Sequence, residues 1–152
     1  MTIEAKLEEL GIVLPEAAAP VASYQPLVVS GATAYVSGQL PFIDGQLVTG
    51  KLGQDVTVER GQAAARACGM MILAQLKAAG LLDRVEQIVK LGGFVSSVPG
   101  FSDQPKVVNG CSDLMADVFG DAGRHARSAV GVPVLPLDAA VEVDAIVALR
   151  VA

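Results

Sequence analysis

Tryptophan is absent from this sequence, histidine occurs once and cysteine twice, and no apolar run approaches the thickness of a bilayer. Because roughly 18 to 20 consecutive apolar residues are needed to span a membrane, we expect no membrane partner. One histidine and two well-separated thiols, Cys68 and Cys111, supply no ligand cluster, so we expect no metal ion. We interpret both cysteines as reduced core residues.

Positive charge is also scarce, with 11 Lys and Arg against 16 Asp and Glu and a formal net charge of −5. These cations are scattered along the chain, and no patch could follow a phosphate backbone, so nucleic acid is not an expected partner. Residues 2–10 are acidic and lack a continuous apolar core, which excludes a secretory signal. We predict a cytoplasmic location.

Apolar residues dominate what is present. They make up 52% of the 152 residues, and only 18% are charged. This length suits one domain with its own core. The mean hydropathy of +0.51 is high for a water-soluble protein. We therefore expect that the excess apolar surface is buried between subunits.

The first third of the chain predicts a short helix followed by hairpins. Leu7 and Leu10 lie on one side of an acidic helix that Gly11 ends, and residues 15–20 have the composition of a linker. A β-hairpin is indicated between residues 27 and 39, and Asp44-Gly45 suits a tight turn between two further short strands.

The remaining chain alternates between helical and strand patterns. A long helix is predicted from about Thr57, its N-cap, to residue 79, and a second helix from a capping Asp103 to about residue 119. Strands are predicted at residues 87–95, 126–132 and 140–151, with Gly92-Gly93 marking a bulge or a close approach by another group. This order predicts an α+β domain, a mixed β-sheet with two helices packed on one face.

Two charged residues break the apolar pattern of the last strands. Arg127 needs an anionic partner because desolvating a lone charge is costly, and Glu142 is the natural internal candidate. One interpretation is a structural cross-strand ion pair. The other is that Arg127 holds a substrate carboxylate while Glu142 handles a proton or a water molecule.

Other polar residues give weaker signals. His125 lies two residues before Arg127 and would share its face, but we interpret it as a surface residue at a strand entrance. Tyr24 is interpreted as a packing residue, and the small residues Ser37 and Gly38 suggest a backbone that approaches a ligand. The chain contains no phosphate loop, nucleotide fingerprint or nucleophile elbow.

Four segments, in order, resemble signatures of the Rid family, also called YjgF-like. Residues 126–130 with 135–146 resemble its C-terminal signature, residues 36–41 its N-terminal signature, and residues 89–95 its central strand. Asn109 also matches a family position. The resemblance covers roughly residues 19–152, so residues 1–18 form an N-terminal helical extension and linker, as in a longer subgroup.

The resemblance implies a chorismate mutase-like fold that assembles as a homotrimer with ligand pockets at the subunit interfaces. It implies hydrolysis of enamines and imines, such as 2-iminopropanoate and 2-iminobutanoate, to 2-oxo acids and ammonia without a cofactor. Arg127 would hold the substrate carboxylate, Glu142 would orient the attacking water, and Tyr24 would line the pocket from the adjacent subunit. Ser37, Gly38, Asn109 and Ala129 complete the expected substrate-binding set.

The chain departs from the family pattern at two places. Ala129 stands where a cysteine is common, so only the backbone groups of that position remain available. Ala22-Ser23 replaces the usual Gly-Pro before the tyrosine. These departures bear on which imine is the substrate. The second hypothesis is a non-catalytic protein that binds a 2-oxo acid or a similar small anion through Arg127, with Glu142 as its structural counter-charge. The family's endoribonuclease label, L-PSP, gives a distant third.

Overall fold

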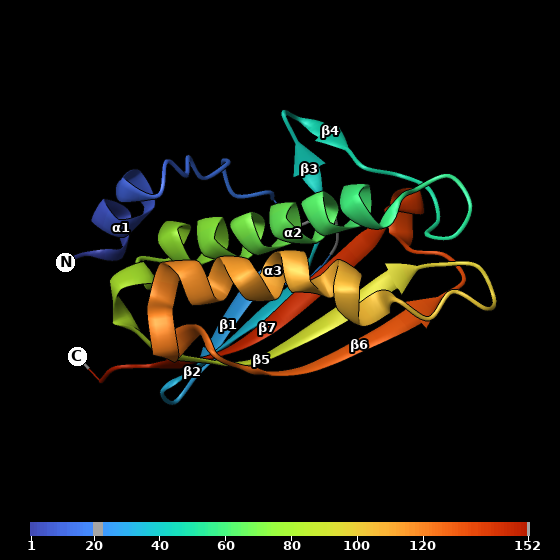
Figure 1. Cartoon of the computed structure of the whole chain (residues 1–152). Coiled ribbons are helices and arrows are strands. Elements are labelled where there is room, and N and C mark those ends of the chain that lie inside the picture. The colour runs from blue at the N-terminus through green and yellow to red at the C-terminus, as the bar shows by residue number, and fades with distance from the viewer. Residues whose placement is uncertain (20–22, 152) are drawn as a thin grey trace.

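In the computed structural model, which describes residues 1–19 and 23–151, a five-stranded mixed sheet carries two long helices on one face (Figure 1). The sheet order is β1-β2-β7-β5-β6, and every neighbouring pair is antiparallel except β5 and β6. The strands are β1 Leu27–Ser30, β2 Thr33–Gln39, β5 Val85–Ser96, β6 Ala126–Val132 and β7 Val141–Leu149. The predicted α+β class, a mixed sheet with two helices packed on one face, is confirmed.

The helices α2 (Val58–Ala78) and α3 (Gln104–Phe119) lie side by side over this sheet (Figure 1). Thr57 caps α2 as predicted, because its hydroxyl accepts the Arg60 N–H at 3.1 Å. Asp103 occupies the N-cap position of α3, as predicted, but its side chain makes no capping hydrogen bond, so only its capping role is wrong. The side-chain amide of Gln104, the first residue of the helix, donates to the Phe101 carbonyl at 2.8 Å.

Alternation along β7 divides the sheet into two faces. Val141, Val143 and Ala145 are buried in the core beneath the helices, whereas Glu142 and Asp144 point to the opposite face. We call that opposite side the free face. The helix side therefore contains the hydrophobic core, and charged groups are concentrated away from it.

A short hairpin, β3 (Phe42–Ile43) with β4 (Gln46–Leu47), stands apart from the main sheet (Figure 1). Asp44 and Gly45 both have positive φ, of 51° and 76°, which confirms the predicted tight turn. Three short 3₁₀ segments complete the chain: η1 Leu82–Arg84, η2 Gly120–Gly123 and η3 Pro136–Asp138.

The N-terminal helix α1 (Ile3–Glu9) packs on the same core as the rest of the domain. Leu7 is buried there, and the Ile3 N–H donates to Asp83 at 2.7 Å. Exposed Lys77 and Glu4 approach to 3.4 Å between α2 and α1. The structure does not test residue 18 as a domain boundary, which stays a prediction.

Two further expectations can be compared with the structure. Cys68 and Cys111 are free and buried, as predicted, and burial raises the pKa of Cys111 to about 12 despite the nearby Arg127 charge. Gly92 and Gly93 allow the predicted close approach, by Asp144 on the free face and by Val108 of α3 respectively. The alternative prediction, a bulge at these two glycines, is wrong, because the register shifts of β5 lie between residues 85 and 90. No helix within the described residues is long and apolar enough to cross a bilayer.

Candidate functional site

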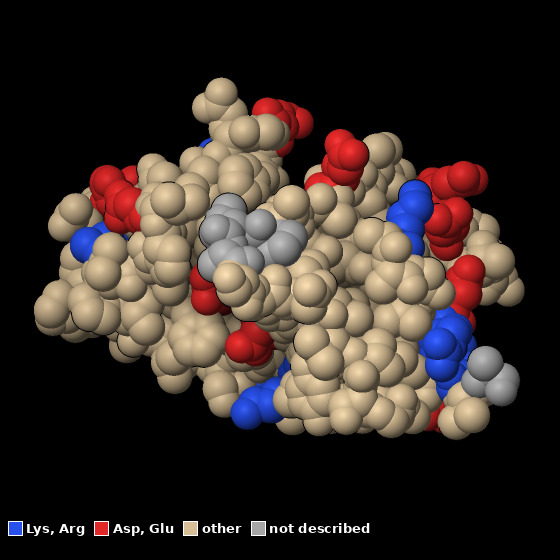
Figure 2. All heavy atoms as spheres, turned by 180° about the vertical axis from the view of Figure 1, so that it is seen from behind, with Lys and Arg blue, Asp and Glu red and all other residues tan. Residues whose placement is uncertain are grey.

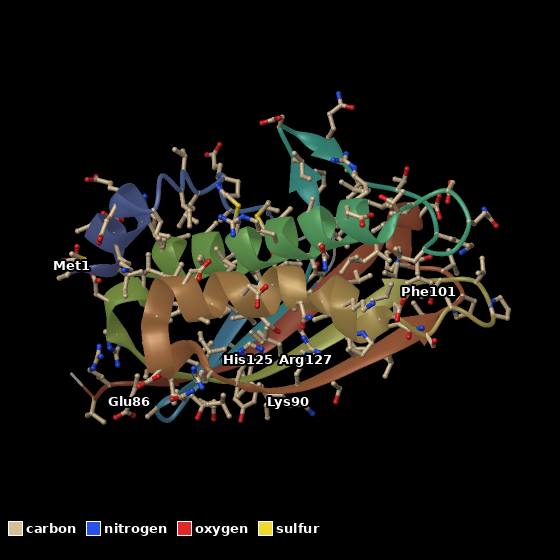
Figure 3. The ribbon with its side chains drawn as sticks, in the orientation of Figure 1. Met1, Glu86, Lys90, Phe101, His125 and Arg127 are labelled. Carbon is tan, nitrogen blue, oxygen red and sulfur yellow. The ribbon has the colours of Figure 1, made fainter. Side chains whose placement is uncertain are left out.

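Arg127 lies on the edge strand β6 and points to the helix side of the sheet. It pairs in register with buried Leu91, and its guanidinium reaches α3 above (Figure 3). There Nη1 donates to Asn109 Oδ1 at 2.8 Å and to Ser112 Oγ at 3.1 Å. Asn109 and Ser112 are three residues apart on α3 and therefore share one face of that helix. The guanidinium is held by two neutral acceptors and not by a carboxylate.

His125 continues this chain of hydrogen bonds. Its Nε2 lies 2.8 Å from Ser112 Oγ, and its Nδ1 lies 2.7 Å from the carbonyl oxygen of Gly123 in η2. We call Asn109, Ser112, His125 and Arg127 the Arg127 cluster. The histidine shares the side of Arg127, as expected, but it is half-buried and hydrogen-bonded, so its interpretation as a surface residue is wrong.

Glu142 lies on the free face, beside the point where β2 bulges. The register of β2 against β7 shifts between Val36 and Gln39, and a Cβ built on Gly38 would lie 2.5 Å from Glu142 Oε2. Only glycine therefore leaves the carboxylate in its observed place. Burial raises the pKa of Glu142, and the nearby charge of Asp144 raises it further.

Ser37 and Tyr24 lie close to the same bulge. Together with Gly38 they line a small hollow of about 120 Å³, in which the Ser37 hydroxyl donates to the Pro26 carbonyl at 3.1 Å. Tyr24 is exposed. We call Tyr24, Ser37, Gly38 and Glu142 the Glu142 cluster. Its members come from three separate segments and were all among the residues expected from the sequence.

Within one chain Arg127 and Glu142 lie on opposite faces of the sheet. Glu142 pairs with Phe94 on the free face, whereas Arg127 pairs with Leu91 on the helix side. The expectation that Glu142 is the internal partner of Arg127 is therefore wrong for a single chain. The apolar sequence around Arg127 does not show which face of an edge strand its side chain occupies. In the structure the hydrogen-bond acceptors on α3 hold it on the helix side.

The free face also carries a larger hollow of about 590 Å³ over the middle of the sheet. Its lining combines apolar Tyr35 and Phe94 with charged Lys90 and Asp144. Burial raises the pKa of Asp144, while a Gly92 N–H bond and the Lys90 charge act in the opposite direction. Lys90 points away from the helices (Figure 3). This hollow adjoins the Glu142 cluster through Ser37, which lines both hollows.

The structure also places the remaining expected residue and reveals one that the sequence did not indicate. Ala129 lies in β6 opposite Gly93 and packs against the core, two residues beyond Arg127 and on the same side. Ser112 was not expected. Its spacing of three residues from Asn109 places both side chains on one face of α3. That spacing indicates a shared site only once Arg127 is known to face α3.

Comparisons with known proteins show what this chain is similar to as a whole. Residues 4–149 match a family model described as YjgF/chorismate mutase-like, with an unproven endoribonuclease activity in the same description. Protein TCP17 of Trypanosoma cruzi is 55% identical over 97% of this chain and 94% of its own length. A 2-iminobutanoate/2-iminopropanoate deaminase of Dermatophagoides farinae is 30% identical over 90% of this chain and 93% of its own.

Among solved structures, one from Agrobacterium tumefaciens, described as a protein of unknown function, superposes with a TM-score of 0.90 at 51% identity. The superposition covers 97% of this chain and 92% of that one. The similarity therefore extends over the whole domain, α1 included, since the family match begins at residue 4.

Proposed function

Because this chain belongs to the YjgF/chorismate mutase-like family, also called Rid, we propose that it hydrolyses 2-imino acids to 2-oxo acids and ammonia. The observation that carries the proposal is the state of Arg127. Both of its hydrogen bonds use Nη1, so within the described residues the Nε–Nη2 edge is uncommitted. That edge presents two parallel N–H donors, which match the two oxygens of a carboxylate.

Glu142 supplies the second requirement, a base for water. Its raised pKa, which burial causes, makes it a better proton acceptor than an ordinary carboxylate. In the proposed reaction it takes a proton from a water molecule as the water oxygen bonds to C2 of the imine. As this bond forms, the second electron pair of the C2=N double bond moves to the nitrogen, which takes the proton from Glu142. The nitrogen then takes the second proton of water from the new C2 hydroxyl as the C2–N bond breaks, so that ammonia leaves and C2 becomes the carbonyl of the 2-oxo acid.

A single pocket that uses both residues requires more than one copy of the chain, since they face opposite sides of one sheet. We propose a homotrimer in which the Arg127 cluster of one protomer meets the Glu142 cluster of the next. Exposed apolar side chains on the free face, Val28, Tyr35 and Val130, support its burial against another subunit. Light scattering tests this assembly, and a stable monomer would remove the shared pocket.

The deaminase assay generates 2-iminopropanoate or 2-iminobutanoate in solution from the parent amino acid and follows imine loss with and without the protein. Imines hydrolyse in water unaided, so one positioned base with its typical contribution of about 10²–10⁴-fold suffices. We expect faster loss with the protein present. The 30% identical deaminase supports this expectation.

The second candidate is a non-catalytic protein that binds a 2-oxo acid or a similar small anion through Arg127. The separation of Arg127 and Glu142 within one chain favours it, because binding at Arg127 needs no second subunit. No acceleration with several amino-acid precursors, together with measurable 2-oxo acid binding, would select this candidate.

Ribonuclease action is the third and weakest candidate. On the face that Figure 2 presents, Lys and Arg are separated by wide uncharged areas and by acidic groups. A protein with net charge −5 and dispersed cations neutralises few phosphates, so we expect RNA binding that is weak and falls steeply with salt. Tight, salt-resistant RNA binding by pure protein would reverse this ranking.

A further inference from the structure

The Ser112–His125 pair is not used by the reaction proposed above, although it contacts Arg127 directly. Three short contacts connect it: Arg127 Nη1 to Ser112 Oγ at 3.1 Å, Ser112 Oγ to His125 Nε2 at 2.8 Å, and His125 Nδ1 to the Gly123 carbonyl at 2.7 Å. The carbonyl ends the chain because it can only accept a hydrogen bond.

The direction of every hydrogen in this chain follows from its two ends. The Gly123 carbonyl requires a proton on His125 Nδ1, and the Arg127 guanidinium can only donate to Ser112 Oγ. In neutral imidazole Nε2 is then an acceptor, so the Ser112 hydroxyl donates its hydrogen to it. When His125 is neutral, the Ser112 hydroxyl hydrogen is therefore bonded to His125 Nε2 and is not available to a ligand.

A second proton on the ring reverses the middle contact. Nε2 then becomes a donor, and Ser112 Oγ accepts from both the imidazolium and Arg127. The serine hydrogen is released to another acceptor, and a positive charge appears one side chain away from the guanidinium. Both changes favour an anion at Arg127.

We propose that His125, acting through Ser112, is a positioning residue that fixes the direction of the Arg127 guanidinium and links anion binding there to the uptake of a proton. This inference rests on the proposed role of Arg127 as the holder of the substrate carboxylate. The ligand class is a 2-oxo or 2-imino acid, and its carboxylate is the anion that the proton favours.

Of the charged groups around His125, only Arg127 and the ligand are expected to take part in this linkage. On α3, Asp113 and Asp117 are exposed to solvent, which screens them, and exposed Asp121 of η2 lies 3.7 Å from Arg124. Buried Cys111, beside Ser112, stays a neutral thiol because its pKa is about 12. Glu86 and Lys90 of the adjacent strand β5 are exposed, and Lys90 points to the free face.

The chain offers a direct test because His125 is its only histidine. Long-range ¹H–¹⁵N correlation spectra of the full-length protein then contain one imidazole, whose two nitrogen shifts report tautomer and protonation. We expect the Nδ1–H tautomer at pH 8. At a fixed pH between 6 and 7, adding pyruvate should shift the ring toward the doubly protonated form.

Binding measurements give the second readout. We expect pyruvate affinity to rise about three- to tenfold from pH 8 to pH 5.5, as befits a half-exposed charge near the ligand. His125→Gln, whose side chain cannot take up a proton, should lose this rise, whatever its affinity at pH 8. Since Glu142 can also take up protons on ligand binding, the same titration in Glu142→Gln separates its contribution, and the His125-dependent rise should persist there.

Ser112 tests the connection itself. Ser112→Ala should weaken pyruvate binding about three- to tenfold at pH 8, the loss of one ordinary hydrogen bond, and should abolish the effect of pyruvate on the ring. Ser112→Thr retains the hydroxyl and should restore both. Ser102→Ala, the same change at an exposed serine ahead of α3, should alter neither.

Two negative results have different meanings. If pyruvate binds but leaves the ring signals unchanged, and Ser112→Ala lowers only the melting temperature, the pair is merely structural and this inference fails while the proposed function stands. If neither pyruvate nor 2-oxobutanoate binds between pH 5.5 and pH 8, Arg127 is not a carboxylate holder, and both proposals fail together.

Discussion

The Arg127 cluster and the Glu142 cluster treat their charged groups in opposite ways. Arg127 is held by Asn109 and Ser112, and the hydrogen bonds continue to the Gly123 backbone. The Glu142 carboxylate lies against Gly38 and near the like charge of Asp144. Within the described part of the chain, no hydrogen bond lowers its pKa. One cluster fixes a charge in place, and the other makes a charge less stable.

This difference matches the tasks that we propose for them. An anion holder works best when its donors are fixed before the ligand arrives, since no binding energy is then spent on ordering them. A base works best when its ionised form is poorly stabilised, because it then takes a proton more readily. The contrast can be tested by removing or adding one group at a time.

The largest expected effect comes from Glu142→Gln. The amide keeps the shape of the side chain but cannot accept the proton of water, so kcat for imine hydrolysis should fall about 10²–10⁴-fold. Binding of a 2-oxo acid should change little. Steady-state kinetics with pyruvate inhibition measures both, and an unchanged kcat would remove Glu142 from the reaction.

Arg127→Ala should give the next largest effect, and on binding more than on turnover. The substrate carboxylate is charged before and after reaction, so the lost charge-assisted hydrogen bonds, worth about 1.5–3 kcal/mol, should weaken affinity for substrate and 2-oxo acid alike. Arg127→Lys should restore little, because an ammonium does not reproduce the paired donors.

Arg60→Ala is the matched control for that change. It removes an exposed arginine in the first turn of α2, outside the Arg127 cluster and outside the hollow that this cluster lines. Its affinity for pyruvate should stay close to that of the wild type. Lowered stability with unchanged 2-oxo acid binding in Arg127→Ala would contradict the assignment of Arg127.

Gly38→Ala should have a smaller effect, confined to the chemical step. The added methyl group would meet Glu142 Oε2 at 2.5 Å, and the flexible carboxylate can move aside, so stability should change little. A displacement of about 1 Å can cost about 10²-fold in rate, and we expect a kcat loss of roughly tenfold. Gly92→Ala crowds Asp144 in the same way and should leave kcat largely intact.

How far the sequence could predict this molecule depends on the range of the interactions involved. The cap at Thr57, the Asp44-Gly45 turn and the alternation along residues 141–149 follow from neighbours in sequence, and all three were predicted correctly. Asp103 does precede α3, as predicted, but it makes no capping bond, because capping depends on backbone geometry as well as on residue type. Its φ and ψ of −95° and 26° do not aim the carboxylate at the first turn.

The site was predictable in its membership and not in its pairing. Arg127, Glu142 and Gly38 were singled out from the residue pattern and Asn109 from resemblance to a family, but their division between two faces depends on register and on which strand is an edge. Those are properties of the assembled sheet. Ser112 and the hydrogen-bonded role of His125 emerge only when α3 is placed over β6, since nothing local connects residues 13 positions apart.

The smallest expected effect, from Asp144→Asn, tests whether Glu142 is tuned by its neighbour. Asp144 has a raised pKa in the folded protein, mainly through burial, so its contribution to stability is fully present below the unfolded value, near 3.8, and is lost as pH rises through the folded value. The variant should therefore be more stable than the wild type at pH 7, and equally stable near pH 3. Because Asp144 is only half-buried, we expect a gain below about 1 kcal/mol, which thermal melts at the two pH values can measure. Since the Asp144 charge raises the pKa of Glu142, its removal should also move the acidic limb of the kcat profile to lower pH. A stability gain without movement of that limb would mean that burial alone sets the basicity of Glu142.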